Sequence, residues 1–175
     1  MDISIQRATP DKADSFWQAI DTVARERRYL LFLQAPPIES TRRFVDQIIE
    51  KGWSQFYAIH AGRVVGWCDV LRNEREGMRH VGHLGMGILP DYRGIKIGTR
   101  LISETVADAI RKGITRIELE VFASNTRAMA LYQKMGFVAE GRKRRARFLD
   151  GEYDDNVLMA LVTSDTQPPP GSAEG

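Results

Sequence analysis

The sequence predicts a mixed fold of the α/β (α+β) class, in which helices flank one central, mostly antiparallel sheet. Three observations lead to this prediction. Runs rich in β-branched residues alternate along the chain with segments whose apolar residues recur at helical spacing. Two-residue turn signals join neighbouring strand-like runs, a pattern typical of antiparallel hairpins. The length of 175 residues suits a single domain with one core.

The N-terminal elements follow from these patterns. Residues 3–8 alternate polar and apolar side chains, which predicts a strand. Thr9 and Pro10 then supply a helix N-cap and a proline at the first helical position. Apolar residues at helical spacing follow, so this segment is predicted to be a helix. Pro36 and Pro37 break the chain before a second helix begins.

The second helix is expected to end at Gly52, a residue that commonly follows the last helical turn. Residues 55–60 and 63–71 are strand-like in composition. Ala61-Gly62 lies between them and reads as a hairpin turn. This part of the chain is therefore predicted to form two neighbouring antiparallel strands.

Strands and helices alternate in the C-terminal half. The expected elements are a strand over 80–89, a helix over 94–112, a strand over 114–121, a helix over 125–135, and strands over 137–148 and 152–162. Asp150-Gly151 is a strong hairpin turn signal. The complete order is β-α-α-β-β-β-α-β-α-β-β in one domain over residues 1–165. The proline-rich tail, 166–175, is predicted to be disordered.

Composition narrows the classes of function and location. The net charge is +2, from 25 basic and 23 acidic residues, so no global field favours a nucleic acid or a membrane. The single cysteine, Cys68, excludes an intrachain disulfide and a cysteine-based zinc site, and we predict no metal site. Neither a signal peptide nor a membrane-spanning stretch is recognisable in the sequence, so we expect a cytoplasmic protein.

The most informative segment is Leu84–Leu101, LGMGILPDYRGIKIGTRL, in which a strand ends at a proline and a loop with glycines opens into a helix. The first backbone N–H groups of a helix have no partner within it, and the helix dipole adds partial positive charge there. Glycines let an anion approach the backbone. The segment predicts either a phosphate-binding loop or a tight strand–helix turn. It lacks the Gly-Lys-Ser/Thr ending of a Walker loop and the spacing of a dinucleotide-binding fold.

A second segment, Asn125–Phe137, reads NTRAMALYQKMGF. Together the two segments resemble the GNAT superfamily of N-acetyltransferases, in which an arginine/glutamine-x-x-glycine-x-glycine loop binds the pyrophosphate of CoA. The resemblance covers most of the chain, because the flanking strands also fall where a GNAT-like fold has them. It implies a GNAT domain over residues 1–165, with acetyl-CoA as cosubstrate and a small-molecule amine or an amino acid as acceptor.

The resemblance also implies which residues bind acetyl-CoA. Main-chain atoms at the end of one strand are expected to pair with the pantetheine amides, and a backbone N–H there to polarise the thioester carbonyl. The diphosphate is expected at the loop and helix start. The expected cofactor-binding residues are Met86, Gly87, Ile88, Arg93, Gly94, Ile95, Lys96, Ile97, Gly98, Asn125 and Lys134.

One position departs from the family pattern, because Lys96 stands where the family usually has its middle glycine. A left-handed conformation at this position costs lysine roughly 1–2 kcal/mol. With a negative φ, the N–H still points at phosphate and the ammonium adds a cation. Because Gly94 and Gly98 are retained, we expect the negative φ at Lys96.

Acetyl transfer to an amine needs an acid and a route for a proton. Tyr132 matches the catalytic tyrosine of the family, and a tyrosine with a pKa of about 10 is protonated at neutral pH and can donate to the departing thiolate. Without the resemblance, Tyr132 reads as a core residue. Glu120 is the candidate base, because glutamates of similar placement serve in some GNAT members that acetylate protein N-termini. His83 is the rival base, and ordered water is a third alternative.

The acceptor pocket is expected between the first two helices and the last hairpin, around residues 26–33 and 142–155. The resemblance places it there, and acidic residues near the hairpin turn are candidates for holding an ammonium group. These candidates are Glu152, Asp154 and Asp155. Five aromatic residues could line the pocket or belong to the core, and at their spacings the core is the more common place: Trp17, Trp53, Trp67, Tyr29 and Phe32. Sequence alone does not identify the acceptor.

Three alternative functions stay open. In the first, the acceptor is a protein N-terminus or a lysine. In the second, the chain binds acetyl-CoA without turnover, which Lys96 suggests. In the third, the basic run Arg142–Arg147 binds nucleic acid, although a charged edge strand also accounts for it, and we expect no nucleic-acid or membrane partner. A homodimer is a further possibility, because GNAT members frequently dimerise.

Overall fold

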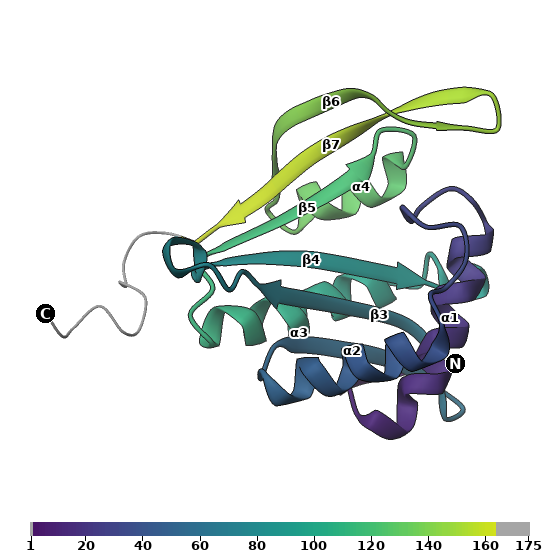
Figure 1. Cartoon of the computed structure of the whole chain (residues 1–175), viewed down its shortest axis with the longest axis vertical. Coiled ribbons are helices and arrows are strands. Elements are labelled where there is room, and N and C mark those ends of the chain that lie inside the picture. Colours follow the sequence, from purple (N-terminus) through teal and green to yellow (C-terminus); the bar gives the residue numbers. More distant parts are fainter. Residues whose placement is uncertain (1, 164–175) are drawn as a thin grey trace, which may run out of the picture.

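The computed structural model describes residues 2–163, which form one sheet flanked by helices (Figure 1). The strands are β1 (Ser4–Arg7), β2 (Ser54–His60), β3 (Arg63–Arg72), β4 (Val81–Ile88), β5 (Arg116–Phe122), β6 (Val138–Leu149) and β7 (Glu152–Val162). The α-helices are α1 (Ala13–Arg25), α2 (Ile38–Glu50), α3 (Ile97–Arg111) and α4 (Thr126–Lys134). This order confirms the predicted fold class. The boundary predicted after residue 165 and the tail at 166–175 lie outside the described residues.

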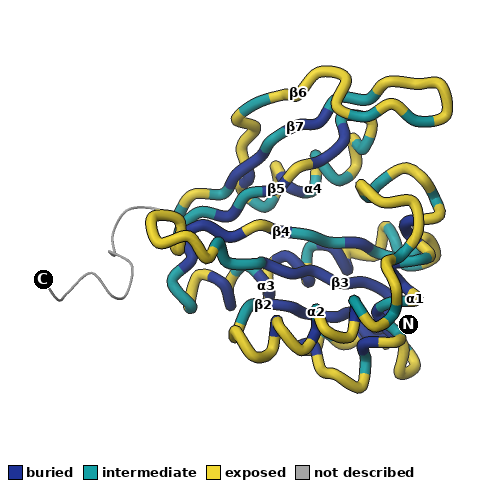
Figure 2. The backbone as a smooth tube through the Cα atoms, viewed as in Figure 1, coloured by how far each residue is buried: buried dark blue, intermediate teal, exposed yellow. Residues whose placement is uncertain are grey.

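The helices cover the two faces of the sheet in pairs. α1 and α2 belong to one core cluster, which includes Phe16, Val45 and Trp67. α3 and α4 belong to the other, which includes Leu101 and Tyr132. Figure 2 shows that the central strands are buried along much of their length, while the outer surfaces of the helices are exposed. Because side chains alternate between the faces of a strand, residue parity assigns each side chain to one of these two layers.

The strand order is β1-β2-β3-β4-β5-β7-β6, and every neighbouring pair is antiparallel except β4 and β5. The chain between these two strands passes through α3, as a crossover between parallel strands requires. Their pairing runs only from Val81 opposite Arg116 to His83 opposite Glu118. Beyond this point β4 and β5 diverge, so the sheet splits into two parts at its centre (Figure 1).

β6 is an edge strand and carries the basic run Arg142–Arg147. Its pairing with β7 is interrupted by a register shift between Lys143 and Arg147, and most of the strand is exposed. The ion pairs formed by the run are Arg142–Asp155, Lys143–Glu120 and Arg147–Asp154. A bulged edge with paired charges protects a sheet against edge-to-edge association. The run therefore has the location that the edge-strand reading predicted.

Asp108 on α3 connects this helix to two strands. Its buried carboxylate accepts hydrogen bonds from Arg7 on β1 at 2.7 and 3.0 Å, from Ser54 on β2 at 2.7 Å and from Lys112 at 2.6 Å. Burial alone would raise the pKa of Asp108, but the hydrogen bonds from Arg7, Lys112 and Ser54 outweigh burial and hold this pKa well below its ordinary value. The network fixes α3 against the N-terminal part of the sheet.

The start of α3 differs from the prediction. The sequence pattern predicted a helix from residue 94, whereas α3 begins at Ile97. Gly94 and Lys96 have φ values of 87° and 66°, which a right-handed helix excludes. The ends of the strands and of α4 agree with the prediction to within two residues.

Candidate active site

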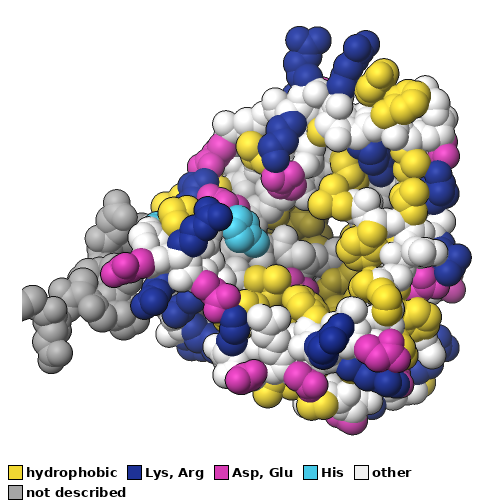
Figure 3. Space-filling view, viewed as in Figure 1, with side chains coloured by type: hydrophobic (Ala, Val, Ile, Leu, Met, Phe, Trp, Pro, Cys, Tyr) yellow, Lys and Arg dark blue, Asp and Glu magenta, His cyan; other side chains and the backbone are white. Residues whose placement is uncertain are grey.

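The divergence of β4 and β5 opens a cleft with a volume of about 530 Å³. The residues that line it come from the end of α1 and the loop after it, from β4, from the start of α3, from the end of β5 and from α4: Val23, Tyr29–Phe32, Leu84–Ile88, Tyr92–Gly94, Lys96–Thr99, Glu120, Val121, Asn125, Arg127, Ala128, Leu131 and Tyr132. Figure 3 shows a hollow at the centre of one face, with apolar side chains around its rim. The cleft thus joins both helical layers through the gap in the sheet.

The predicted phosphate loop forms one wall of the cleft. After the 3₁₀ turn Pro90–Tyr92, Arg93 is extended, and Gly94 and Lys96 adopt left-handed conformations before α3 begins at Ile97. The expectation of a negative φ at Lys96 was therefore wrong. The chain must turn from an extended residue into a helix within four positions, and this turn places Lys96 in the N-cap position with φ of 66°. Lysine adopts this conformation at a cost of roughly 1–2 kcal/mol.

Two glycines bring α4 close to this loop. A Cβ atom at Gly98 would lie 2.8 Å from Cδ2 of Leu131, so glycine lets the Leu131 side chain of α4 pack directly against the start of α3. A Cβ atom at Gly94 would lie 2.9 Å from a guanidinium nitrogen of Arg127. Arg127 thus adds a cation beside the loop, and the sequence analysis did not single it out. Arg127 lies on α4, and its closeness to Gly94 becomes apparent only once the loop and α4 are placed together in the fold.

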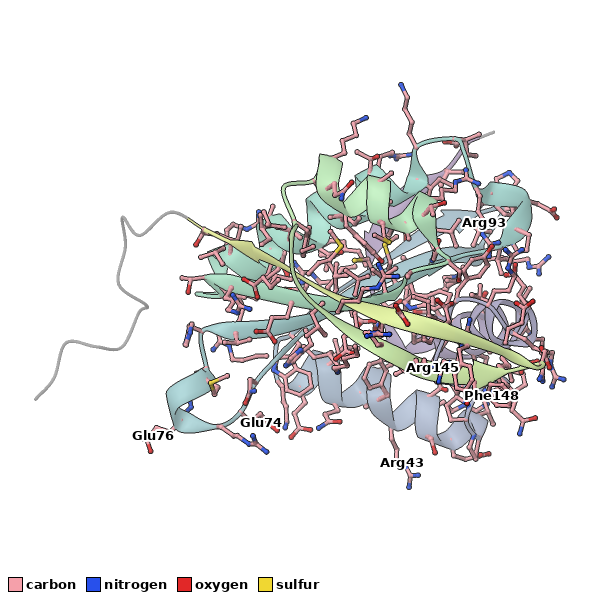
Figure 4. The ribbon with its side chains drawn as sticks, turned by 90° about the horizontal axis from the view of Figure 1, so that it is seen from above. Arg43, Glu74, Glu76, Arg93, Arg145 and Phe148 are labelled. Atoms are coloured by element: carbon pink, nitrogen blue, oxygen red, sulfur yellow. The ribbon has the colours of Figure 1, made fainter. Side chains whose placement is uncertain are left out.

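Arg93, the first residue of the loop motif, is directed away from the open helix start. Its guanidinium donates to both carboxylate oxygens of Glu26, at 2.8 and 2.5 Å, and its Nε donates to the Ile88 carbonyl at 2.9 Å. It also lies over the ring of Tyr29, 4.8 Å from the ring centroid. The Glu26 carboxylate raises the pKa of Arg93. The side chain of Arg93, labelled in Figure 4, therefore connects the loop to the segment after α1.

Met86, Gly87 and Ile88 line the cleft at the end of β4, as predicted. One edge of this segment pairs with β3, where Met86 is opposite Cys68. The other edge has no pairing with β5, because the parallel ladder ends at His83. Main-chain groups on that edge are thus available to an extended ligand. Gly87 is required by packing, since a Cβ atom there would lie 2.2 Å from the Trp67 ring.

Tyr132 lies on α4 and lines the cleft, although it is only 7% exposed. Its ring packs against Phe137, with the ring centroids 5.8 Å apart. Burial raises the pKa of the Tyr132 phenol, so it remains protonated across the neutral range. The ring thus belongs to the core, and the same side chain borders the cleft, while the catalytic role of Tyr132 stays a prediction.

The remaining predicted cofactor residues divide into two groups. Asn125 lines the cleft, and its Oδ1 accepts a hydrogen bond from the Ala128 N–H at 3.2 Å, which caps α4. Gly94, Lys96, Ile97 and Gly98 also line the cleft. Ile95 and Lys134 are exposed and do not line it.

Glu120 lies at the end of β5, on the face opposite Tyr132. Residues 117, 119 and 121 point into the α3–α4 core, so by parity Glu118 and Glu120 face the α1–α2 side. The Glu120 carboxylate accepts a hydrogen bond from Lys143 at 2.7 Å and another from Asn156. Tyr132 and Glu120 therefore approach the cleft from opposite faces of the sheet.

His83 occupies the last position of β4 that is paired with β5. Its Nδ1 is 3.6 Å from a carboxylate oxygen of Glu118, and Arg116 donates to the same carboxylate at 2.6 Å. His83 is 56% exposed and is absent from the cleft lining. Of the two candidate bases, only Glu120 borders the cleft.

The loop after α1 and the tip of the β6–β7 hairpin meet over the acceptor side of the cleft. Arg27 pairs with Asp150 at 2.7 Å, and Arg147 donates to the Arg28 carbonyl at 3.1 Å. Figure 4 shows Arg145 and Phe148 on the side of the sheet that also carries α2. The two segments predicted to form the acceptor pocket are therefore in contact, and the pocket itself stays a prediction.

The predicted acceptor residues are only partly brought to the cleft. Tyr29 and Phe32 line it, whereas the three tryptophans do not. Asp154 is held by Ser124 and Arg147, and Asp155 by Arg142 and the Arg145 N–H. These carboxylates have protein partners, so they are not the free anions that the sequence analysis considered.

Within residues 2–163, no group of three or more His, Cys, Asp or Glu side chains is arranged to hold a metal ion. In the same part of the chain, no helix combines the length and apolar character needed to cross a membrane. The cleft is therefore the candidate functional site.

Comparison with curated proteins identifies relatives that act on amines. Residues 17–137 match the model of the acetyltransferase (GNAT) family. The chain is 31% identical over 114 residues to L-amino acid N-acetyltransferase AaaT of Escherichia coli, covering 63% of this chain and 69% of the relative. It is 36% identical over 76 residues to the ribosomal protein bS18 alanine N-acetyltransferase of E. coli, covering 43% of this chain and 51% of the relative.

Solved structures share the fold over nearly the whole chain. A phosphinothricin acetyltransferase of Sinorhizobium meliloti in complex with AcCoA superimposes with a TM-score of 0.89 at 19% identity, covering 98% of this chain and 95% of that chain. A putative acetyltransferase of Salmonella typhimurium with acetyl-CoA gives 0.89 at 15% identity, covering 97% and 98%. The family match spans more than half of the chain and includes both walls of the cleft. The chain belongs to the GNAT family of acetyltransferases and is an N-acetyltransferase.

Proposed function

We propose that this protein transfers the acetyl group of acetyl-CoA to a primary amine of a small molecule or an amino acid. One observation carries the proposal: the open start of α3, the unpaired edge of β4 and the Tyr132 side chain all border the same cleft. The similarity to an L-amino acid N-acetyltransferase supports the acceptor class.

The residues present fit acetyl-CoA. The free N–H groups at the start of α3, with Lys96 and Arg127 beside them, suit the diphosphate. Main-chain groups of Met86–Ile88 suit the pantetheine amides, which resemble a peptide strand. When bound in this way, acetyl-CoA supplies an activated acetyl group as a thioester. In this proposal Asn125 contributes its amide beside the pantetheine, while Ile95 and Lys134 lie at the outer margin.

Tyr132 is the proposed acid. As the C–S bond breaks, the sulfur takes the phenol proton, and the nitrogen that has formed the new C–N bond returns a proton to Tyr132. A phenol whose pKa is raised by burial stays loaded with its proton until this step. The surrounding core, including Phe137, holds the ring in one orientation.

Glu120 is the proposed base, directly or through water. It would take one proton from the acceptor ammonium before the nitrogen attacks the carbonyl carbon, and release this proton to solvent afterwards. Its ion pair with Lys143 is largely exposed, and such pairs contribute only about 0–1 kcal/mol, so this contact does not prevent proton uptake. His83 is the weaker candidate, because it does not border the cleft.

A protein N-terminus is the second candidate acceptor, favoured by the 36% identity to the ribosomal-protein alanine acetyltransferase. A cytoplasmic location and a homodimer stay predictions from the sequence.

The direct test is a CoA-release assay over free amino acids, simple alkylamines, polyamines and peptide N-termini, with acetyl-CoA affinity measured by calorimetry. Release of CoA with small amines supports the proposal. Faster turnover of peptides would favour the second candidate. Binding of acetyl-CoA without turnover on any amine would show a non-catalytic binding module, and absence of binding would end the proposal.

A further inference from the structure

Asp69 is a buried carboxyl group beside the cleft that the proposed mechanism does not use. It lies in the middle of β3, is 6% exposed, and is paired in register with Gln55 on β2 and Gly85 on β4. By parity it shares the α1–α2 face with Trp67, which is also the face of Glu120. It therefore lies on the acceptor side of the sheet.

Gly85 leaves the Asp69 carboxylate next to the cleft. Gly85 lines the cleft, and a Cβ atom there would lie only 3.1 Å from Oδ1 of Asp69. The Asp69 carboxylate thus lies directly against the space into which a side chain at position 85 would project. Gly87, two residues further, lies in the same way against the buried ring of Trp67. Because Gly85 and Gly87 carry no side chains, this face of β4 places none between the cleft and the side chains of Asp69 and Trp67.

The Asp69 carboxylate lacks a cationic partner. Within residues 2–163 it forms no ion pair, and the Gln55 amide is the polar side chain that lies beside it and partly opposes the rise in its pKa. The Nε2 atom of this amide is itself buried without a partner in good hydrogen-bond geometry. Burial raises the pKa of Asp69 to about 7, and the Gln55 side chain opposes this only in part. A buried carboxylate in such a place is costly unless a cation or a proton joins it.

The surrounding elements supply no such cation. The buried residues of α1 and α2 are uncharged. Tyr57 on β2 and Cys68 on β3 are held protonated by burial. On the same face, His83 lies next to Glu118, at the last paired position of β4 and β5. The other carboxylates along the cleft already have basic partners, namely Glu26 with Arg93 and Glu120 with Lys143.

We propose that Asp69 binds the ammonium group of the acceptor across Gly85, and that the acceptor is an amine with a single cationic group and an apolar body. This inference rests on the proposed function. Of the three carboxylates Glu26, Glu120 and Asp69, only Asp69 lacks a basic partner within residues 2–163, so one ammonium group is matched and a second is not. The exposed side chains of Leu31 and Phe32, which line the opposite side, suit an apolar body. Asp69 thus holds the ammonium that Glu120 deprotonates.

Asp69→Asn tests this with n-butylamine as the probe. We expect the KM for n-butylamine to rise about 10- to 100-fold, as for loss of a hydrogen bond to a charged group, with little change in kcat or in the affinity for acetyl-CoA. Gly85→Ala, which crowds the carboxylate, is expected to raise the same KM. Asp14→Asn is the matched control, because Asp14 is exposed and pairs with Arg42 on α2. An unchanged KM in Asp69→Asn would overturn the inference.

A second measurement decides the matter without turnover. The carboxyl carbon of Asp69 is followed by NMR against pH, alone and with n-butylammonium chloride or n-butanol. We expect n-butylammonium to lower the pKa of Asp69 and n-butanol to leave it unchanged. An equal titration curve in all three samples would contradict ammonium binding at Asp69. If the ammonium shifts the curve but no amine releases CoA, the binding inference stands and the proposed function fails.

Discussion

The guanidinium of Arg93 and the carboxylate of Glu26 form a two-point ion pair, with N–O distances of 2.8 and 2.5 Å. This pair connects the start of the diphosphate loop to the residue that follows α1. Tyr29, which borders the acceptor side of the cleft, lies against the same guanidinium. Arg93 therefore joins the proposed donor and acceptor sides of the cleft through direct contacts.

Glu26→Gln is expected to weaken both the fold and cofactor binding. Both side chains are largely buried, and removing one charge leaves Arg93 without its partner, at a cost of about 1–3 kcal/mol. Urea unfolding measures the stability, and calorimetry measures the acetyl-CoA affinity. Glu50→Gln, on the exposed side of α2, serves as control and is expected to change neither quantity. Equal behaviour of the two variants would argue against a positioning role for Glu26.

Lys96→Gly is expected to stabilise the protein. Glycine removes the cost of the left-handed conformation, roughly 1–2 kcal/mol, but loses more entropy on folding, so the net gain is about 0.5–1 kcal/mol. Lys96→Ala keeps the left-handed cost and is expected to show no such gain. Thermal unfolding distinguishes the two variants. A drop in the melting temperature of Lys96→Gly would mean that the lysine side chain contributes more than its backbone costs.

Tyr132→Phe is expected to lower kcat by about 10²–10⁴-fold, the usual contribution of a general acid, with unchanged acetyl-CoA affinity. Packing against Phe137 is retained, so the melting temperature should stay within a degree or two. Because burial raises the pKa of Tyr132, wild-type kcat should show no fall from tyrosine ionisation up to about pH 10. Full kcat in the variant would refute the assignment of Tyr132 as the acid.

Glu120→Gln is expected to lower kcat and to remove the low-pH limb of its pH profile, since a glutamine cannot take up the acceptor proton. Lys143→Ala removes the ion-pair partner and keeps the carboxylate. It is expected to retain most of the activity, because an exposed pair contributes only about 0–1 kcal/mol. Steady-state rates between pH 5 and 9 compare the three proteins. A loss in His83→Gln that exceeds the loss in Glu120→Gln would transfer the role to His83.

Asp108→Asn is expected to destabilise the protein by about 3–5 kcal/mol at neutral pH, because Arg7 and Lys112 lose their shared buried partner. The pKa of Asp108 is lower in the folded than in the unfolded protein. Its contribution to stability is therefore complete above the unfolded pKa of about 4, and is lost as the pH falls below that value. Urea unfolding at several pH values should show the two proteins converging in acid. A constant difference down to pH 2 would contradict this linkage.

Much of the fold was predictable, because local signals agreed with the global pattern. The Ala61-Gly62 and Asp150-Gly151 turns lie where the hairpins form, and both have the positive φ values that such turns need. Helix and strand ends were found to within two residues wherever a glycine or proline marked them. The exceptions were α1, which begins at Ala13 after a 3₁₀ turn over Pro10–Lys12, and α3, whose first turn is delayed by the left-handed backbone at Lys96. A lysine by itself gives no signal for that conformation, and the one hint was the glycine that the family usually has at this position.

The candidate site was predictable only as two motifs. Arg93 and Lys96 were named from the loop, but the Glu26 partner of Arg93 is distant in sequence and has no motif of its own. Arg127 and Asp69 were missed for the same reason, since each gains its meaning from a glycine on another element, Gly94 and Gly85.

The sequence by itself determined the order of elements, the family and the cofactor loop, because periodicity, turn residues and short motifs are local properties of the chain. The tertiary structure alone decided which charges are paired and that the Asp69 carboxylate lies behind Gly85 without a cation. The state of Glu120, Asp108 and Asp69 depends on burial and on partners from other strands and helices. Pairing and desolvation are set by distances through space, which the linear order of residues does not contain.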